Sequence, residues 1–262
     1  MEINYVRVGR GKPLLLVHGL GGHWRSWTTL LGPLGAQREL IAIDLPGFGE
    51  TPPLSGEVSI AALADAVVDF LEANGLIGID AVGSSMGARL VLELARREKV
   101  GAVVSLDPGG FWSGWQRHFF FLSIAASIRV LRLLRPMLPP ISRSMIGRTL
   151  LLSQFSACPL RLHPDIVLDE LQSYVAARSF DALLKSLAYG PEQEGMPRGS
   201  AKAPIVIGWG RKDRVSFPNQ AKRAIELFPD ATLHWFEGCG HFPYWDQPKE
   251  TVDLILETTR ER

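Results

Sequence analysis

The segment 83–87, Gly-Ser-Ser-Met-Gly, constrains the fold of this chain more than any other stretch. It follows an apolar run at 77–82 and precedes residues 88–95, in which apolar side chains recur at spacings of three and four. These patterns predict a buried strand and then a helix. A serine in a glycine-bounded turn between a strand and a helix is typical of a nucleophile elbow. Ser85 is therefore the candidate nucleophile, and Ser84 occupies the variable position of the motif.

Further apolar runs alternate with helical patterns along much of the chain. Such alternation predicts an α/β protein whose sheet is mostly parallel and covered by helices on both faces. Its length of 262 residues suits one large domain with room for an insertion. The expected strands lie at 3–8, 14–18, 39–44, 77–82, 100–106, 203–209 and 231–236, and the expected helices at 24–34, 60–74, 88–95, 219–228 and 248–259.

The alternation stops between Phe111 and Gly199. The first part of this segment is aromatic and basic, and no acidic residue occurs between Asp107 and Asp165. Prolines at 136, 139 and 140 favour short helices. We therefore expect a core domain formed by 1–110 and 200–262, with a helical cap inserted at 111–199. The cap should contribute an apolar pocket, and its arginines suggest a solvated basic face or weak contact with a membrane surface.

A serine nucleophile needs a base, normally histidine, that is oriented by a carboxylate. Asp213 follows the strand expected at 203–209, and His241 follows the strand expected at 231–236. Side chains just beyond the carboxyl ends of parallel strands converge on one crevice. These residues can therefore meet Ser85, although Asp107, which also follows a strand, is an alternative carboxylate.

Five motifs in this order resemble those of the α/β-hydrolase superfamily. The resemblance implies a serine hydrolase in which Ser85 attacks, His241 moves the proton and Asp213 orients the imidazole. It also implies that the backbone N–H groups of Leu20 and Met86 hold the oxyanion. The five motifs span 18–22 (His-Gly-Leu-Gly-Gly), 44–49, 83–87, 210–213 and 238–241.

The other chemically reactive side chains have simpler interpretations. His18 is expected to brace the loop at 18–22, His23 and His234 to be surface or packing residues, and Cys239 to be a small packing residue. No group of side chains has metal-ligand spacing, so neither a metal nor a cofactor is expected. A net charge of +1 does not indicate nucleic-acid binding. Two distant cysteines and the absence of a signal pattern favour the cytoplasm.

The resulting hypothesis is a serine hydrolase that cleaves a small, apolar ester through an acyl-enzyme on Ser85. Carbon–carbon bond hydrolases of aromatic ring-cleavage pathways are an alternative, because the segments 84–87 and 107–110 are similar to theirs. A cofactor-free perhydrolase and a ligand receptor with the hydrolase fold are further alternatives. The expected partner is one small molecule, and the oligomeric state stays open.

Overall fold

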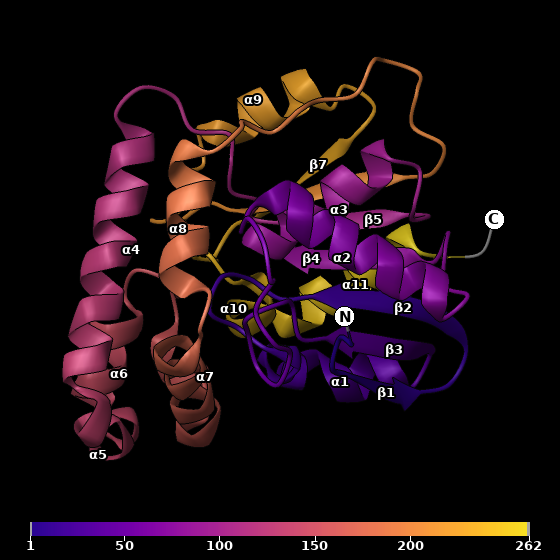
Figure 1. Ribbon diagram of the computed structural model, residues 1–262. Coiled ribbons are helices and arrows are strands. Elements are labelled where there is room, and N and C mark those ends of the chain that lie inside the picture. The colour runs from indigo at the N-terminus through magenta and orange to yellow at the C-terminus, as the bar shows by residue number, and fades with distance from the viewer. Residues whose placement is uncertain (1, 261–262) are drawn as a thin grey trace.

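The computed structural model describes residues 2–260, and within them seven strands form a single sheet (Figure 1). The sheet order is β1-β3-β2-β4-β5-β6-β7, and β1 alone of these strands is antiparallel to its neighbour, β3. The predicted, mostly parallel sheet is thus confirmed. The strands are β1 (Tyr5–Gly9), β2 (Lys12–Val17), β3 (Arg38–Ile43), β4 (Asp80–Ser84), β5 (Val103–Leu106), β6 (Ile205–Gly210) and β7 (Thr232–Phe236).

Helices cover both faces of this sheet, which explains why the central strands are continuously apolar. Helices α2 (Ile60–Ala73) and α3 (Met86–Arg96) pack together, and α3 contacts β4 and β5. On the other face, α1 (Thr28–Gly35) packs against α11 (Pro248–Thr258), which follows the short helix α10 (Pro243–Asp246). Helix α9 (Gln220–Leu227) packs against β7. A 3-10 turn, η1 (Trp24–Trp27), precedes α1.

The strand expected at 77–82 in fact begins at Asp80 and ends at Ser84. Two features delay its start. Gly78 has a φ of +85° and lies in a turn. The Ile77 side chain, in the same turn, is 44% exposed. The apolar run therefore includes a turn before the strand. The later end carries β4 directly into the elbow, so no loop separates the strand from Ser85.

The chain between β5 and β6 forms a group of helices beyond the carboxyl ends of the strands, on the left of Figure 1. Two short 3-10 turns accompany them, η2 (Arg135–Met137) and η3 (Pro159–Arg161). The helices are α4 (Gln116–Leu133), α5 (Leu138–Arg143), α6 (Met145–Leu152), α7 (Pro164–Ala176) and α8 (Phe180–Tyr189).

The prediction of short helices is wrong for α4, which has 18 residues. No proline occurs within α4, and the next one along the chain, Pro136, lies in η2 beyond the end of that helix. Pro139 and Pro140 lie in the first turn of α5, where the missing N–H groups would have no intrahelical partner. The prolines therefore separate helices without breaking one.

Candidate active site

The backbone of Ser85 has φ +53° and ψ −111°, in the left-handed region that costs a non-glycine residue free energy. A Cβ at Gly83 would collide with the carbonyl oxygen of Gly87, and one at Gly87 with the carbonyl oxygen of Val17. Only glycines allow the elbow to pack this closely against β2. Ser85 is the N-cap residue of α3, where the helix dipole favours negative charge.

The structure brings together Ser85, His241 and Asp213. The Nε2 atom of His241 lies 2.9 Å from Ser85 Oγ, and its Nδ1 atom lies 2.8 Å from Asp213 Oδ2. A carboxylate at Nδ1 places the imidazole proton there, so Nε2 is left to accept the serine proton. The second Asp213 oxygen accepts the backbone N–H groups of Val215 and Ser216 at 2.7 and 3.1 Å. Asp213 and His241 are both buried.

Asp107, the alternative carboxylate, lies beside Asp213 and makes no hydrogen bond to the imidazole among residues 2–260. Its Oδ1 atom accepts the Gly210 N–H at 2.8 Å, whereas Oδ2 has no hydrogen-bond partner in the same range. Burial and then the neighbouring Asp213 charge raise the pKa of Asp107 well above its usual value. Asp213, which is hydrogen-bonded to His241 Nδ1, is therefore the carboxylate placed to orient the imidazole.

The backbone N–H groups of Leu20 and Met86 flank the serine and donate to no acceptor within residues 2–260. His18 holds the loop that carries Leu20, as the sequence suggested. Its Nε2 atom accepts the Leu45 N–H at 2.9 Å, so its Nδ1 atom donates to the Gly19 carbonyl oxygen at 2.7 Å. Burial lowers the pKa of His18 to about 4, which keeps the ring neutral in this double role.

Helix α7 contacts the same loop through polar side chains. The Ser173 hydroxyl donates to the Gly21 carbonyl oxygen at 2.8 Å. The Ser26 hydroxyl donates to the buried carboxylate of Glu170 at 2.9 Å. His23, which the sequence assigned to the surface or to packing, is buried, with Nε2 3.0 Å from Asp169. These pairs could not be predicted from the sequence, because their members lie more than 140 positions apart.

The remaining side chains singled out in the sequence lie away from this chemistry. His234 is partly buried, with Nε2 2.9 Å from a carboxylate oxygen of Glu250 on α11. Cys239 is fully buried, and burial raises the pKa of its thiol. Ser84 is also fully buried, so its hydroxyl cannot take the place of Ser85.

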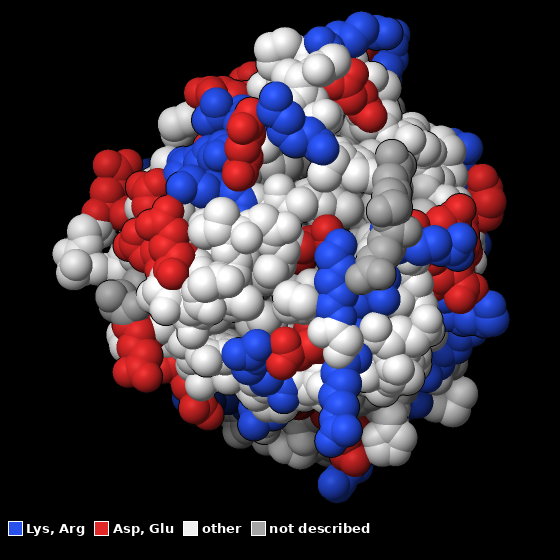
Figure 2. Space-filling model, turned by 90° about the vertical axis from the view of Figure 1, so that its right-hand side faces the viewer, with Lys and Arg blue, Asp and Glu red and all other residues white. Residues whose placement is uncertain are grey.

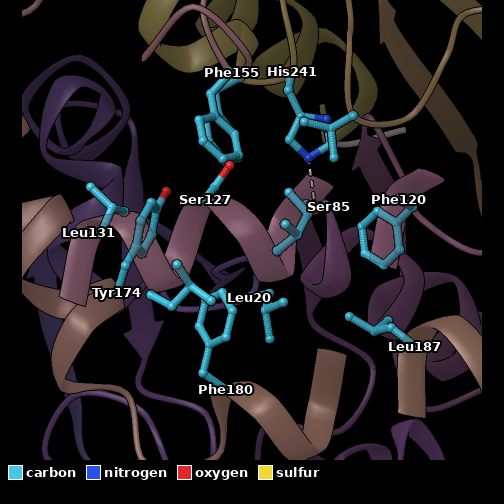
Figure 3. A pocket seen from close by; sticks show the side chains of 14 residues that line it. Leu20, Ser85, Phe120, Ser127, Leu131, Phe155, Tyr174, Phe180, Leu187 and His241 are labelled. Carbon is cyan, nitrogen blue, oxygen red and sulfur yellow. Dashed lines mark hydrogen bonds between the residues drawn. The ribbon is translucent and has the colours of Figure 1, made fainter. Parts of the chain in front are cut away.

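An apolar cavity, partly open to solvent, lies between the serine and the helices (Figure 3). Fourteen residues line it, and none of them is Lys, Arg, Asp or Glu. Phe120, Ile124, Ile128 and Leu131 share the inner side of α4. Their spacing in the sequence predicts an apolar side of a helix. Apolar residues on the outer side of α4 have the same spacing, so the sequence did not show which side of α4 lines the cavity.

Replacing Glu170 by glutamine is expected to weaken the pH dependence of stability. Burial raises the pKa of Glu170 from 4.5 to about 7, so the folded protein holds an extra proton between those values. The free energy of unfolding therefore falls as the pH rises through this range, by about 3 kcal/mol from this group. Urea unfolding at pH 5 and pH 8 measures the difference. Equal pH dependence in Glu170→Gln and the parent protein would contradict this assignment.

Comparison with known proteins identifies the family of this chain. The sequence model of the alpha/beta hydrolase family matches residues 14–254. A 2-hydroxy-6-oxo-6-phenylhexa-2,4-dienoate hydrolase from Comamonas testosteroni is 27% identical, over 99% of this chain and 92% of its own. A 2-hydroxy-6-oxononadienedioate/2-hydroxy-6-oxononatrienedioate hydrolase from Dechloromonas aromatica is 24% identical, over 98% of this chain and 90% of the relative's length. A thermophilic esterase from Thermogutta terrifontis shares the fold, with a TM-score of 0.74 and 21% identity over 97% and 92%.

Proposed function

Since this chain belongs to the alpha/beta hydrolase family, we propose that it is a serine hydrolase with Ser85, His241 and Asp213 as its catalytic residues. The observation that carries the proposal is the continuous hydrogen-bonded chain from Asp213 through His241 to Ser85, which ends in the apolar cavity. In this arrangement His241 removes the proton from Ser85 Oγ as that oxygen attacks a carbonyl carbon.

The Leu20 and Met86 N–H groups are proposed to receive the oxyanion that forms on the attacked carbonyl. Collapse of the tetrahedral intermediate breaks the bond to the leaving group, which takes its proton from His241 Nε2. The acyl group stays on Ser85. Water, deprotonated by the same nitrogen, then attacks the acyl carbon and releases an acid and free Ser85. Asp213 stabilises the imidazolium that appears in both halves of the reaction.

For the scissile bond, we favour a carbon–carbon bond next to a ketone over the ester that the sequence suggested first. The support is the pair of relatives that act on ring-cleavage dienoates, each similar over nearly the whole chain. Carbon is a poor leaving group unless its electron pair is delocalised. A 2-hydroxy-6-oxo-dienoate provides that delocalisation after its enol becomes a ketone, because the departing carbon is conjugated with the 2-oxo acid.

An ester remains the second candidate, and a specific observation favours it. No cation lines the cavity, and esters need none, whereas a dienoate carries a carboxylate that has to stay near the cavity mouth. The two candidates separate in one comparison of kcat/KM values. A value for 2-hydroxy-6-oxo-6-phenylhexa-2,4-dienoate well above those for p-nitrophenyl esters of graded length supports carbon–carbon cleavage. The opposite order supports an esterase.

The apolar lining also predicts which end group the substrate carries. A phenyl ketone end is expected to be turned over at least 100-fold more efficiently, in kcat/KM, than a nonadienedioate end. The second carboxylate of the dioate would be buried without a partner, which costs several kcal/mol. Steady-state kinetics with both dienoates measures the ratio. Equal efficiency would mean that the reactive end of the substrate lies outside this cavity.

A further inference from the structure

Helix α4 presents a continuous apolar stripe on the side facing away from the cavity. Trp115, just before the helix, and Phe119, Leu122, Val130 and Leu133 are exposed by 64, 41, 64, 48 and 80%. Their spacings of four, three, eight and three residues place them on one side of a helix. We call these five residues the outer α4 stripe. A helix that is apolar on two opposite sides is normally covered on both.

The exposed apolar surface continues beyond α4. Met137 lies in the turn η2, and Met145, Ile146 and Leu150 lie on α6, with exposed fractions between 52 and 73%. In Figure 1, helices α4, α5 and α6 are the part of the chain farthest from the sheet. Among the described residues outside the outer α4 stripe, η2 and α6, four large apolar side chains are exposed, Val8, Ile77, Leu160 and Tyr189, and the last two also belong to the chain between β5 and β6. The exposure is therefore a local property of the helical segment.

Three arginines beside this surface are unpaired, whereas Arg132 of α4 is ion-paired with Asp181 of α8. The exposed side chains of Arg129, Arg135 and Arg143 have neither an ion-pair nor a hydrogen-bond partner among the described residues. No acidic residue occurs in the sequence between positions 107 and 165. Figure 2 shows the side of the molecule that faces away from α4, where basic and acidic side chains are intermixed. An apolar stripe with uncompensated arginines on its flanks matches an anionic apolar interface.

We propose that the outer α4 stripe and the exposed residues of α6 dock this protein on an anionic lipid surface. No helix within residues 2–260 is long and apolar enough to cross a bilayer, so α4 would lie in the plane of the interface. Trp115 and Phe119 then enter the headgroup boundary, and the arginines face lipid phosphates. This proposal concerns a surface and does not depend on which bond the enzyme cleaves.

A second copy of the chain fits this surface less well than lipid does. In a two-fold dimer the same patch faces itself, so Arg129, Arg135 and Arg143 would meet their own counterparts. No acidic side chain occurs in 108–164, and Asp181 is already paired with Arg132, so such an interface would bring unpaired like charges together. Anionic headgroups supply the opposite charge. Docking would also place the helix that walls the cavity against lipid, where apolar substrates concentrate.

Vesicle flotation with the full chain tests the proposal. Vesicles of phosphatidylcholine with 30% phosphatidylglycerol are expected to bind the protein, and vesicles of phosphatidylcholine alone to bind it at least tenfold less. Leu122→Glu and Leu133→Glu should each lower the bound fraction at least tenfold. Ile77→Glu is the matched control, because Ile77 is an exposed apolar residue on the core, and it should bind as the parent protein does. Unchanged melting temperatures confirm that the variants are folded.

The contribution of the arginines to vesicle binding is tested separately. Each arginine near an anionic surface changes the partition coefficient by roughly fivefold, so Arg129→Gln with Arg135→Gln is expected to weaken binding by roughly 25-fold at low salt. The proposal is overturned if the protein binds no vesicles, if both vesicle types bind it equally, or if Leu133→Glu has no effect. A dimer in light scattering that Leu122→Glu dissociates, without vesicle binding, would instead assign the stripe to a second copy.

Discussion

Replacing Ser85 by alanine is expected to lower kcat by about 10⁴- to 10⁶-fold while leaving the fold intact. The hydroxyl supplies the attacking oxygen, and its loss removes the acyl-enzyme route altogether. Ser85 Oγ has one side-chain partner within the described residues, the Nε2 atom of His241, so its removal disturbs little packing. Steady-state kinetics on the preferred substrate and a thermal melt measure the two effects separately.

Ser84→Ala is the matched control for this variant, because Ser84 is a buried serine one position away. It should retain most of the activity. A fluorophosphonate probe should label the parent protein and Ser84→Ala but not Ser85→Ala. If Ser85→Ala kept more than about a tenth of the parent rate, another nucleophile would be at work. An unlabelled parent protein would favour a ligand receptor with this fold.

The second large effect is expected from Asp213→Asn, with a loss in kcat of about 10⁴-fold. An amide at position 213 keeps the shape of the side chain, but it removes the charge that stabilises the imidazolium and allows the wrong tautomer of His241. Asp107→Asn is the matched variant, since its carboxyl group is equally buried and next to Asp213. Because Asp213, and not Asp107, is hydrogen-bonded to His241 Nδ1, an amide at position 107 should change kcat by less than tenfold.

Measuring kcat for both variants decides between the two carboxylates. If kcat were nearly normal in Asp213→Asn and strongly reduced in Asp107→Asn, Asp107, which follows β5, would be the carboxylate that orients His241. Loss in both would mean that the pair acts as one unit, and Asp213 alone would then not account for the orientation of His241. Thermal melts of the two variants identify any loss caused by unfolding.

The strands of the sheet were predictable because each one leaves a clear pattern in the local sequence. Strands covered on both faces are continuous apolar runs, and each reactive loop follows one directly. Ser85, Asp213 and His241 were therefore identifiable as strand-end residues without knowledge of any distance. The start of β4 was misplaced because the side chain of Ile77 is apolar yet exposed, and periodicity does not report exposure.

The helical segment was less predictable for a physical reason. Helix α4 carries apolar residues on both its inner and outer sides, so its pattern does not reveal which side meets the core. The polar contacts from α7 to the loop at 18–26 join distant positions and depend on the tertiary fold. The boundaries of the cap at 111 and 199 stay a prediction. The raised pKa of Asp107 follows from its burial and then from its proximity to Asp213, and no sequence spacing records either.

The bonds from Ser173 to Gly21 and from Glu170 to Ser26 join the roof of the cavity to the loop that carries the Leu20 N–H. Any motion that lifts α7 to admit a ligand breaks these bonds and releases that loop. The position of the Leu20 N–H group beside Ser85 therefore depends on where α7 lies. A displacement of α7, on the microsecond-to-millisecond timescale typical of such segments, would widen the cavity and at the same time shift one of the two proposed oxyanion donors.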